Sequence, residues 1–126
     1  MSNERYERGL EYLKKIHGRT GEEVIERLEA IDHDLARYII EFPFGDIYSR
    51  PGLDLKSRQI ATVAALITLG AEPQLKSHIN GALNVGCSRK EIIEIIIQMA
   101  IYAGFPRALN AINVAKTVFQ ERDGKG

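Results

Sequence analysis

His78 is the residue best suited by type and position to transfer a proton. Apolar residues stand three or four positions before and after it, which is helical spacing. His78 is therefore predicted to lie on the apolar stripe of a helix. The stripe consists of Leu75, His78, Ile79 and Ala82. Such a histidine is either a core residue with its hydrogen bonds satisfied or an acid or base that titrates near neutral pH. Spacing alone favours the core alternative.

Three cations, Arg50, Lys56 and Arg58, form the second candidate site. Lys56 and Arg58 fall in the first turn of a helix predicted over 55–69, for which Asp54 is a plausible N-cap. The helix dipole disfavours cations there, whereas cations beside exposed helix N–H groups suit an anion such as a carboxylate. The alternative is solvated charge or ion pairing with nearby acids. Spacing alone favours that alternative.

Cys87 and Tyr102 are weaker candidates. A lone cysteine between a glycine and a helix cap is usually a small buried hydrophobe, and the chain has no second cysteine to resolve a sulfenate. Tyr102 continues the polar line of Glu94 and Gln98 along its helix. It is therefore either a core residue with its hydroxyl satisfied or part of a pocket lining.

Helices alone are predicted to position these residues, because apolar residues recur at helical spacing and no alternating strand pattern occurs. Glycines, prolines and capping-box pairs mark the ends. The first predicted helix spans 3–17, and the second begins at about residue 22. A further helical segment is capped by Asp32 and ends before Pro43. Three more helices are predicted over 55–69, 73–85 and 89–103, and Pro106 opens the last one. Residues 44–52 are predicted to form a short turn followed by a loop.

Two of the predicted helices are apolar on nearly every side. Ten of the twelve residues from 92 to 103 are apolar, as are eight of the ten from 60 to 69. Helices of this kind must be covered on most sides, and a small domain has few elements to cover them. We therefore expect a homo-oligomer, with a monomer in which both helices are central as the alternative.

The composition limits the protein to one domain of ordinary globular type. The 126 residues include 17 basic and 17 acidic side chains, so the broad positive field needed for nucleic acids or anionic membranes is not expected. Neither a signal peptide nor an apolar run long enough to span a membrane is evident. With one cysteine and no zinc-like spacing of ligands, we expect a cytoplasmic protein without a metal site.

Two long segments carry a resemblance to a known family. These are GDIYSRPGLDLKSRQIATVAAL (45–66) and QLKSHINGALNVGCSRKEIIEIIIQMAIYAGFPRAL (74–109). Both are similar to the landmark segments of the gamma-carboxymuconolactone decarboxylase family, and the best-matched region extends over 45–119. The resemblance implies a single-domain, all-α helical bundle of the alkyl hydroperoxidase D-like type. It also implies assembly into a homo-oligomeric ring, commonly a hexamer.

The resemblance further implies a cofactor-free carbon–carbon lyase that converts 4-carboxymuconolactone into 3-oxoadipate enol-lactone and CO2, in aromatic-compound catabolism by the beta-ketoadipate pathway. This substrate carries its own electron sink, because the departing carboxylate sits on a ring carbon conjugated to the lactone carbonyl. Arg50 or Arg58 would grip the spectator carboxylate. His78 would stabilise the oxyanion or protonate the ring carbon. Gln74 and Tyr102 are the further residues expected to contact substrate.

Two departures and two alternatives accompany this interpretation. Gln74 stands where the family has an acidic residue, and Asn113 where some members have a histidine. The peroxidatic cysteine pair of hydroperoxidase relatives would fall at Ala71 and Gln74, so that pair is absent. The alternatives are a thiol-dependent antioxidant protein and a non-catalytic helical oligomer that binds a small anion.

Overall fold

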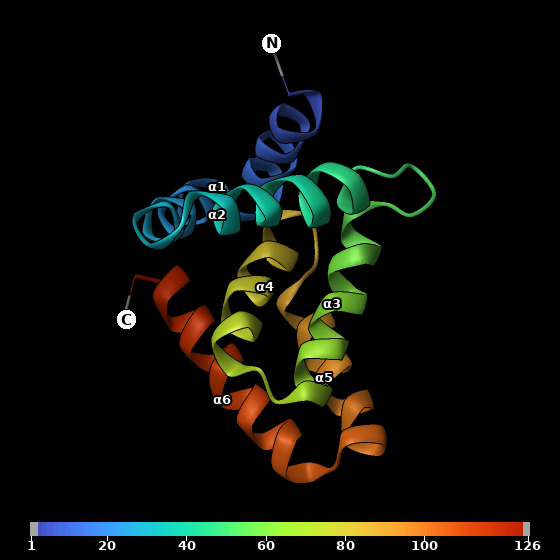
Figure 1. Ribbon diagram of the computed structural model, residues 1–126. Coiled ribbons are helices and arrows are strands. Elements are labelled where there is room, and N and C mark those ends of the chain that lie inside the picture. Colours follow the sequence, from blue (N-terminus) through green and yellow to red (C-terminus); the bar gives the residue numbers. More distant parts are fainter. Residues whose placement is uncertain (1–2, 125–126) are drawn as a thin grey trace. The chain divides into compact units, whose positions relative to one another are not determined.

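Every regular element between residues 3 and 124, the part of the chain that the computed structural model describes, is a helix (Figure 1). The all-α prediction is therefore confirmed. The elements are α1 (Glu4–Ile31), α2 (His33–Ile39), η1 (Ile40–Tyr48), α3 (Leu55–Leu69), α4 (Glu72–Asn84), α5 (Arg89–Ala103) and α6 (Phe105–Arg122). None of the described helices is long and apolar enough to cross a membrane.

Contacts divide the chain into two compact units, which are described separately. The first runs to Leu55 and contains α1, α2 and η1; the second begins at Lys56 and contains α3 to α6. The expectation of one domain stays a prediction.

Several of the residues predicted to begin or end helices do so in the structure. Ser88 and Glu91 form a reciprocal capping box at the start of α5, with hydrogen bonds of 3.0 and 2.8 Å. Asp32 caps α2 by accepting from the Leu35 amide at 3.1 Å. Gly104 ends α5 with a φ of 90°, a conformation that suits glycine. Residues of this kind determine helix ends because they satisfy backbone groups that the helix leaves unpaired.

Two predictions are wrong here: that the helix ends before Pro43, and that the first half of residues 44–52 forms a turn. Instead of ending before Pro43, the helix continues from α2 into η1, a stretch of wide π-helical turns through Tyr48. Proline lacks a backbone N–H and its ring crowds the preceding turn, and a widened turn accommodates both defects. Ile40 and Phe44 are buried along this stretch, so packing favours a helix where the local sequence indicates a loop.

Two glycines allow α1 and η1 to approach closely. A Cβ on Gly9 would overlap the carbonyl oxygen of Ile40, and one on Gly45 would overlap the carbonyl oxygen of Arg5. The two backbones are thus in contact at both positions. This packing holds the first unit together, because no side chain separates the two helices there.

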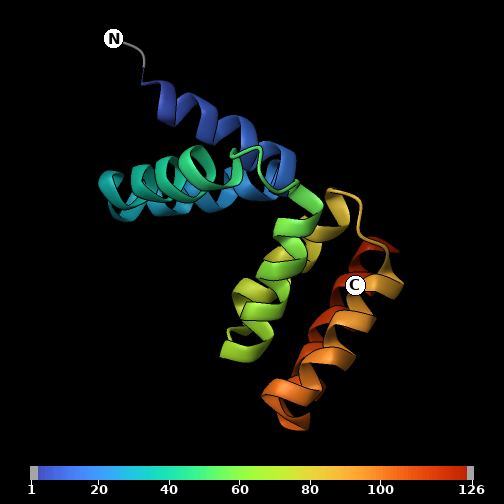
Figure 2. The ribbon, with the colours of Figure 1, turned by 90° about the vertical axis from the view of Figure 1, so that its right-hand side faces the viewer.

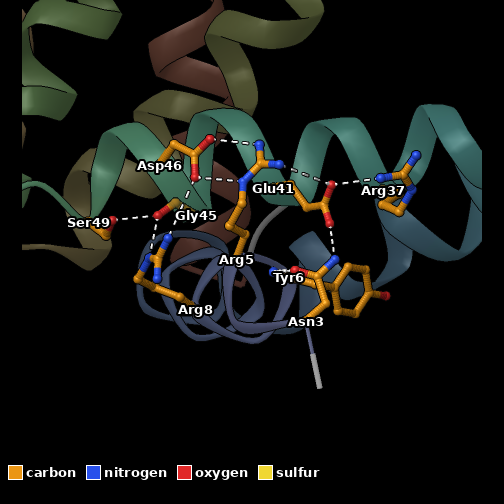
Figure 3. A network of polar contacts seen from close by, with 9 residues as sticks. All are labelled: Asn3, Arg5, Tyr6, Arg8, Arg37, Glu41, Gly45, Asp46 and Ser49. Atoms are coloured by element: carbon orange, nitrogen blue, oxygen red, sulfur yellow. Dashed lines mark hydrogen bonds and ion pairs between the residues drawn. The ribbon is translucent and has the colours of Figure 1, made fainter. Parts of the chain in front are cut away.

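Polar side chains reinforce the same contact (Figure 3). Arg5 pairs with Asp46 at 2.7 Å, and Nε of Arg8 donates to the carbonyl oxygen of Gly45 at 2.6 Å. Glu41 is only 2% exposed, and it accepts hydrogen bonds from Arg37 at 2.9 Å and from Asn3. The buried carboxylate is thus hydrogen-bonded and paired with a cation, as a buried charge requires.

The second unit is built around one apolar cluster. α5 and α6 form an antiparallel hairpin (Figure 2). The contacts also show that α4 packs against α6. All four helices contribute to the buried cluster. Its fully or almost fully buried large members are Val63, Ile67, Leu75, Ile79, Ile92, Ile96 and Val118.

Within this chain, the apolar circumference of α5 is only partly covered. Ile97 is 57% exposed and Ile101 is 75% exposed. With residues of α6 they border a groove of about 330 Å³ whose lining is apolar throughout. The lining consists of Ile96, Ile97, Ala100, Ile101, Phe105, Ala108, Leu109 and Ile112.

We predict that Gly9→Ala destabilises the protein by about 1–3 kcal/mol, the usual cost of overpacking. The added Cβ would push α1 away from the Ile40 carbonyl. Urea denaturation measures the change. Gly52→Ala is the matched control, since a Cβ at Gly52 meets nothing within 4 Å. Equal stability of the two variants would show that the close approach does not matter.

Candidate functional site

His78 lies on α4 and is hydrogen-bonded to a glutamine of the neighbouring helix. Its Nδ1 is 2.9 Å from Oε1 of Gln59 on α3. His78 is half-buried, whereas Gln59 is completely buried. The histidine is therefore held at one ring nitrogen by a side chain that cannot itself be charged.

Gln59 is a residue that the sequence analysis missed. It continues the buried line of α3 at i, i+4 and i+8, with Val63 and Ile67 as the other members. The signal was present in the sequence, because this spacing places a polar side chain on an apolar face. Its partner is 19 residues away on another helix, so spacing within α3 could not identify it.

The buried amide of Gln59 is only half satisfied. Its Oε1 faces His78, but its Nε2 has no hydrogen-bond partner among residues 3–124. A buried donor without a partner typically costs about 1–3 kcal/mol. Such a group in a native structure calls for an explanation, and a functional position is one of them.

Two of the predicted site residues lie within one helical turn of Gln59 or His78 on the same helices. Arg58 is half-buried and precedes Gln59, so their side chains leave α3 about 100° apart. Gln74 is exposed and precedes His78 by four residues, which places both on one face of α4. Arg58, Gln74 and His78 thus belong to two neighbouring helices of the second unit.

The other two predicted residues belong to other elements. Tyr102 is 74% exposed on α5 and is therefore not a core side chain within this chain. Arg50 belongs to the first unit, in the segment that joins η1 to α3, where its amide donates to the Ile47 carbonyl at 3.1 Å.

Lys56 takes part in an ion pair instead of standing apart as a cation. Its Nζ is 3.0 Å from the carboxylate of Glu91, the residue that closes the capping box of α5. The pKa of Glu91 is lowered, first by the hydrogen bond from the Ser88 backbone and then by Lys56. The charge of Lys56 is therefore already balanced by a carboxylate within this chain.

Cys87 is buried at the start of the loop before α5. Burial raises the pKa of its thiol, and Glu91 adds to the effect, while Lys56 opposes it. A thiol in this environment is a poor nucleophile because the thiolate is the reactive form. As for metals, residues 3–124 contain no group of three or more histidine, cysteine or acidic side chains arranged to hold an ion.

Comparison with known proteins places these helices in a known sequence family. The model of the carboxymuconolactone decarboxylase family matches residues 33–117. That span includes Gln59, His78 and both helices that carry them.

Several curated proteins are similar to the chain. The 4-carboxymuconolactone decarboxylase of Acinetobacter baylyi is 33% identical, over 94% of this chain and 89% of the relative. The nitrosuccinic acid decarboxylase of Metarhizium robertsii is 34% identical, over 70% of this chain and 62% of the relative. An uncharacterised 15.0 kDa protein of Paracoccus denitrificans is 38% identical, over 68% of this chain and 65% of the relative.

We predict no thiol-dependent peroxidase activity. A disulfide relay needs two cysteines within reach of each other, and the chain has one, which is buried. The measurement is consumption of an alkyl hydroperoxide with a dithiol donor. Turnover that disappears in Cys87→Ser would contradict the prediction and would favour the antioxidant alternative.

Proposed function

This chain belongs to the carboxymuconolactone decarboxylase family, and from that premise we propose that it is a cofactor-free decarboxylase of a small carboxylated lactone. The substrate class follows from the named activity of the Acinetobacter relative, and 4-carboxymuconolactone is the first compound to test. The observation that carries the proposal is the position of His78. It lies half-buried on an apolar helix face, bonded to Gln59, inside the region that the family model matches.

The proposed reaction needs few catalytic groups from the protein, because the substrate itself accepts the electron pair that carbon–carbon cleavage releases. When the carbon–carbon bond breaks, CO2 leaves and the electron pair is delocalised through the ring double bond onto the lactone carbonyl oxygen. The resulting dienolate then takes up a proton at carbon. The protein has to hold the second carboxylate, stabilise the developing negative charge and supply the proton.

The proposed roles are divided between α3 and α4. Arg58 grips the spectator carboxylate through the paired N–H groups of its guanidinium, with Arg50 as the alternative. His78 acts where charge develops, as oxyanion donor or as acid. Gln74 contacts the substrate from one turn away on the face of α4 that carries His78. Tyr102 would contact it only where a second subunit covers α5.

We also propose that the protein is a homo-oligomer, a hexameric ring by family resemblance. The support is the apolar groove along α5 and α6, which includes Ile97 and Ile101. Monomeric proteins seldom leave large contiguous apolar surface exposed to water. The balanced charge and the single cysteine support a cytoplasmic location.

Ile101→Lys is predicted to weaken the assembly, because it places a charge in the apolar groove. Light scattering coupled to size-exclusion chromatography would show a lower mass for this variant than for the native protein. Gln120→Lys, at an exposed position of α6 outside the groove, is the control and should leave the mass unchanged. A native protein that is a 14.1 kDa monomer at micromolar concentration would contradict the proposal.

His78→Ala is predicted to lower kcat for 4-carboxymuconolactone by about a hundredfold or more, the usual effect of removing an oxyanion donor or acid. Loss of lactone absorbance and release of CO2 measure the rate. Normal turnover by this variant would show that His78 is a core histidine without a catalytic role.

Arg58→Ala is predicted to act mainly on KM. An arginine that grips the spectator carboxylate binds the ground state and the transition state alike, so its loss weakens binding more than it slows the chemical step. Arg27→Ala, at an exposed position of α1, is the matched control and should leave both constants unchanged. An unchanged KM in Arg58→Ala would transfer the role to Arg50.

A further inference from the structure

We propose that Gln59 is the positioning residue for His78: its side-chain oxygen holds the ring in the tautomer protonated at Nδ1, which leaves Nε2 as the nitrogen that meets the substrate. This inference rests on the proposed decarboxylation, which gives His78 its role. Gln59 itself touches the histidine and not the reacting atoms.

The tautomer follows from the atoms that face each other. A glutamine Oε1 can only accept a hydrogen bond, so the Nδ1 that lies 2.9 Å away must donate. In the neutral ring the proton is then on Nδ1, and Nε2 carries a lone pair. In the imidazolium both nitrogens carry protons. The bond to Gln59 is present in both states, so a proton can enter and leave at Nε2 without disturbing the ring's position.

The surroundings of Gln59 argue against a purely structural role. The side chain is completely buried, in line with Val63 and Ile67, where an apolar residue would pack without loss. Instead an amide occupies the position and leaves its own Nε2 without a partner among the described residues. An apolar core is more stable than a half-satisfied polar group. The single bond that the amide does make, to His78, is therefore the feature that explains its presence.

The neutrality of the glutamine is also informative. A carboxylate at this position would fix the same tautomer, but it would strongly favour the imidazolium through its charge. An amide orients the ring without that added preference. Gln59 therefore orients the ring without fixing its protonation state, which suits an acid that must be reprotonated in each turnover.

The tautomer also restricts the protonation state in which His78 can fill either of its proposed roles. A neutral ring protonated at Nδ1 has no hydrogen on Nε2 and cannot donate to an oxyanion there. Only the imidazolium carries a proton on Nε2. After CO2 has left, the ring carbon of the dienolate takes that proton, which leaves His78 neutral with its Nδ1 proton in place, and water restores the imidazolium. Turnover therefore requires protonated His78, so we expect kcat to be lower at high pH than at low pH.

Several charged side chains lie on the helices around α4. Arg58 is half-buried and directly precedes Gln59 on α3. Four other cations of the second unit have the following partners: Lys56 with Glu91 at 3.0 Å, Lys76 with Glu121 at 3.1 Å, Arg122 with Asn80 at 2.9 Å, and Arg89 with Asp123 at 2.6 Å.

The tautomer can be measured directly, without substrate. Long-range ¹H–¹⁵N correlation spectra of protein labelled with ¹⁵N-histidine distinguish a protonated ring nitrogen from one with a lone pair. The chain has three histidines, and the signals of His78 are those lost in His78→Asn. We expect the neutral ring of His78 to carry its proton on Nδ1. A neutral ring protonated at Nε2 would overturn the proposal.

Two substitutions then test the role of the glutamine. Gln59→Met has similar length but no acceptor, so we expect loss of the fixed tautomer and a drop in kcat of about tenfold or more, with KM little changed. Gln59→Glu restores an acceptor. It should retain the Nδ1 tautomer and move the fall of kcat to higher pH, because the carboxylate stabilises the imidazolium. Gln120→Met, at an exposed position of α6, is the control and should behave as the native protein.

Failure of this inference and failure of the proposed function give different results. If the native protein releases no CO2 from the lactone but His78 is protonated at Nδ1, the positioning holds and the function is wrong. If the native protein is active but Gln59→Met keeps its full kcat, the function holds and the positioning is wrong. Should Gln59→Met fail to fold, the native spectra and the pH profile of Gln59→Glu still decide: an unmoved profile contradicts the positioning.

Discussion

The constraint on which the second unit depends is the burial of helices that are apolar on most sides. α3 and α5 expose too much apolar surface to stand alone, so each must be covered by neighbours. α4 and α6 supply part of that cover and complete one apolar cluster. What they leave uncovered on α5, including Ile101, is the surface that a second copy of the chain is proposed to cover.

The same constraint gives the His78–Gln59 pair its chemical setting. Inside an apolar cluster a hydrogen bond is stronger than in water, and a missing one is more costly. The hydrogen bond between Oε1 of Gln59 and Nδ1 of His78 holds the ring at one of its two nitrogens. A substrate that carries its own electron sink needs few catalytic groups from the protein. The proposal assigns the reaction to two such groups, a histidine held this way and an arginine on the adjoining helix.

Much of the fold could be predicted because its signals are local. The Ser88–Glu91 capping box and the glycine at 104 act on backbone groups within one turn, so the sequence alone locates the ends they make. η1 could not be predicted in this way. A proline locally favours a helix end, but the packing of Ile40 and Phe44 and the contact with α1 through Gly9 keep the chain helical. Those contacts join residues more than thirty positions apart.

The candidate site was predicted only in part for the same reason. His78 was recognisable from its apolar stripe and from the family resemblance. Gln59 was not, because its significance lies in a partner on another helix. The exposure of Tyr102 could not be predicted either, since its position in the polar line of α5 does not show whether another element covers that line.

The central claim is that this chain releases CO2 from a carboxylated lactone without a cofactor. The most direct test is to incubate the purified, chelator-treated protein with 4-carboxymuconolactone and to measure CO2 and enol-lactone together. The account predicts that both appear in equal amounts and at a rate proportional to the protein concentration. Lactone that survives unchanged, with no CO2 above the uncatalysed background, would contradict it.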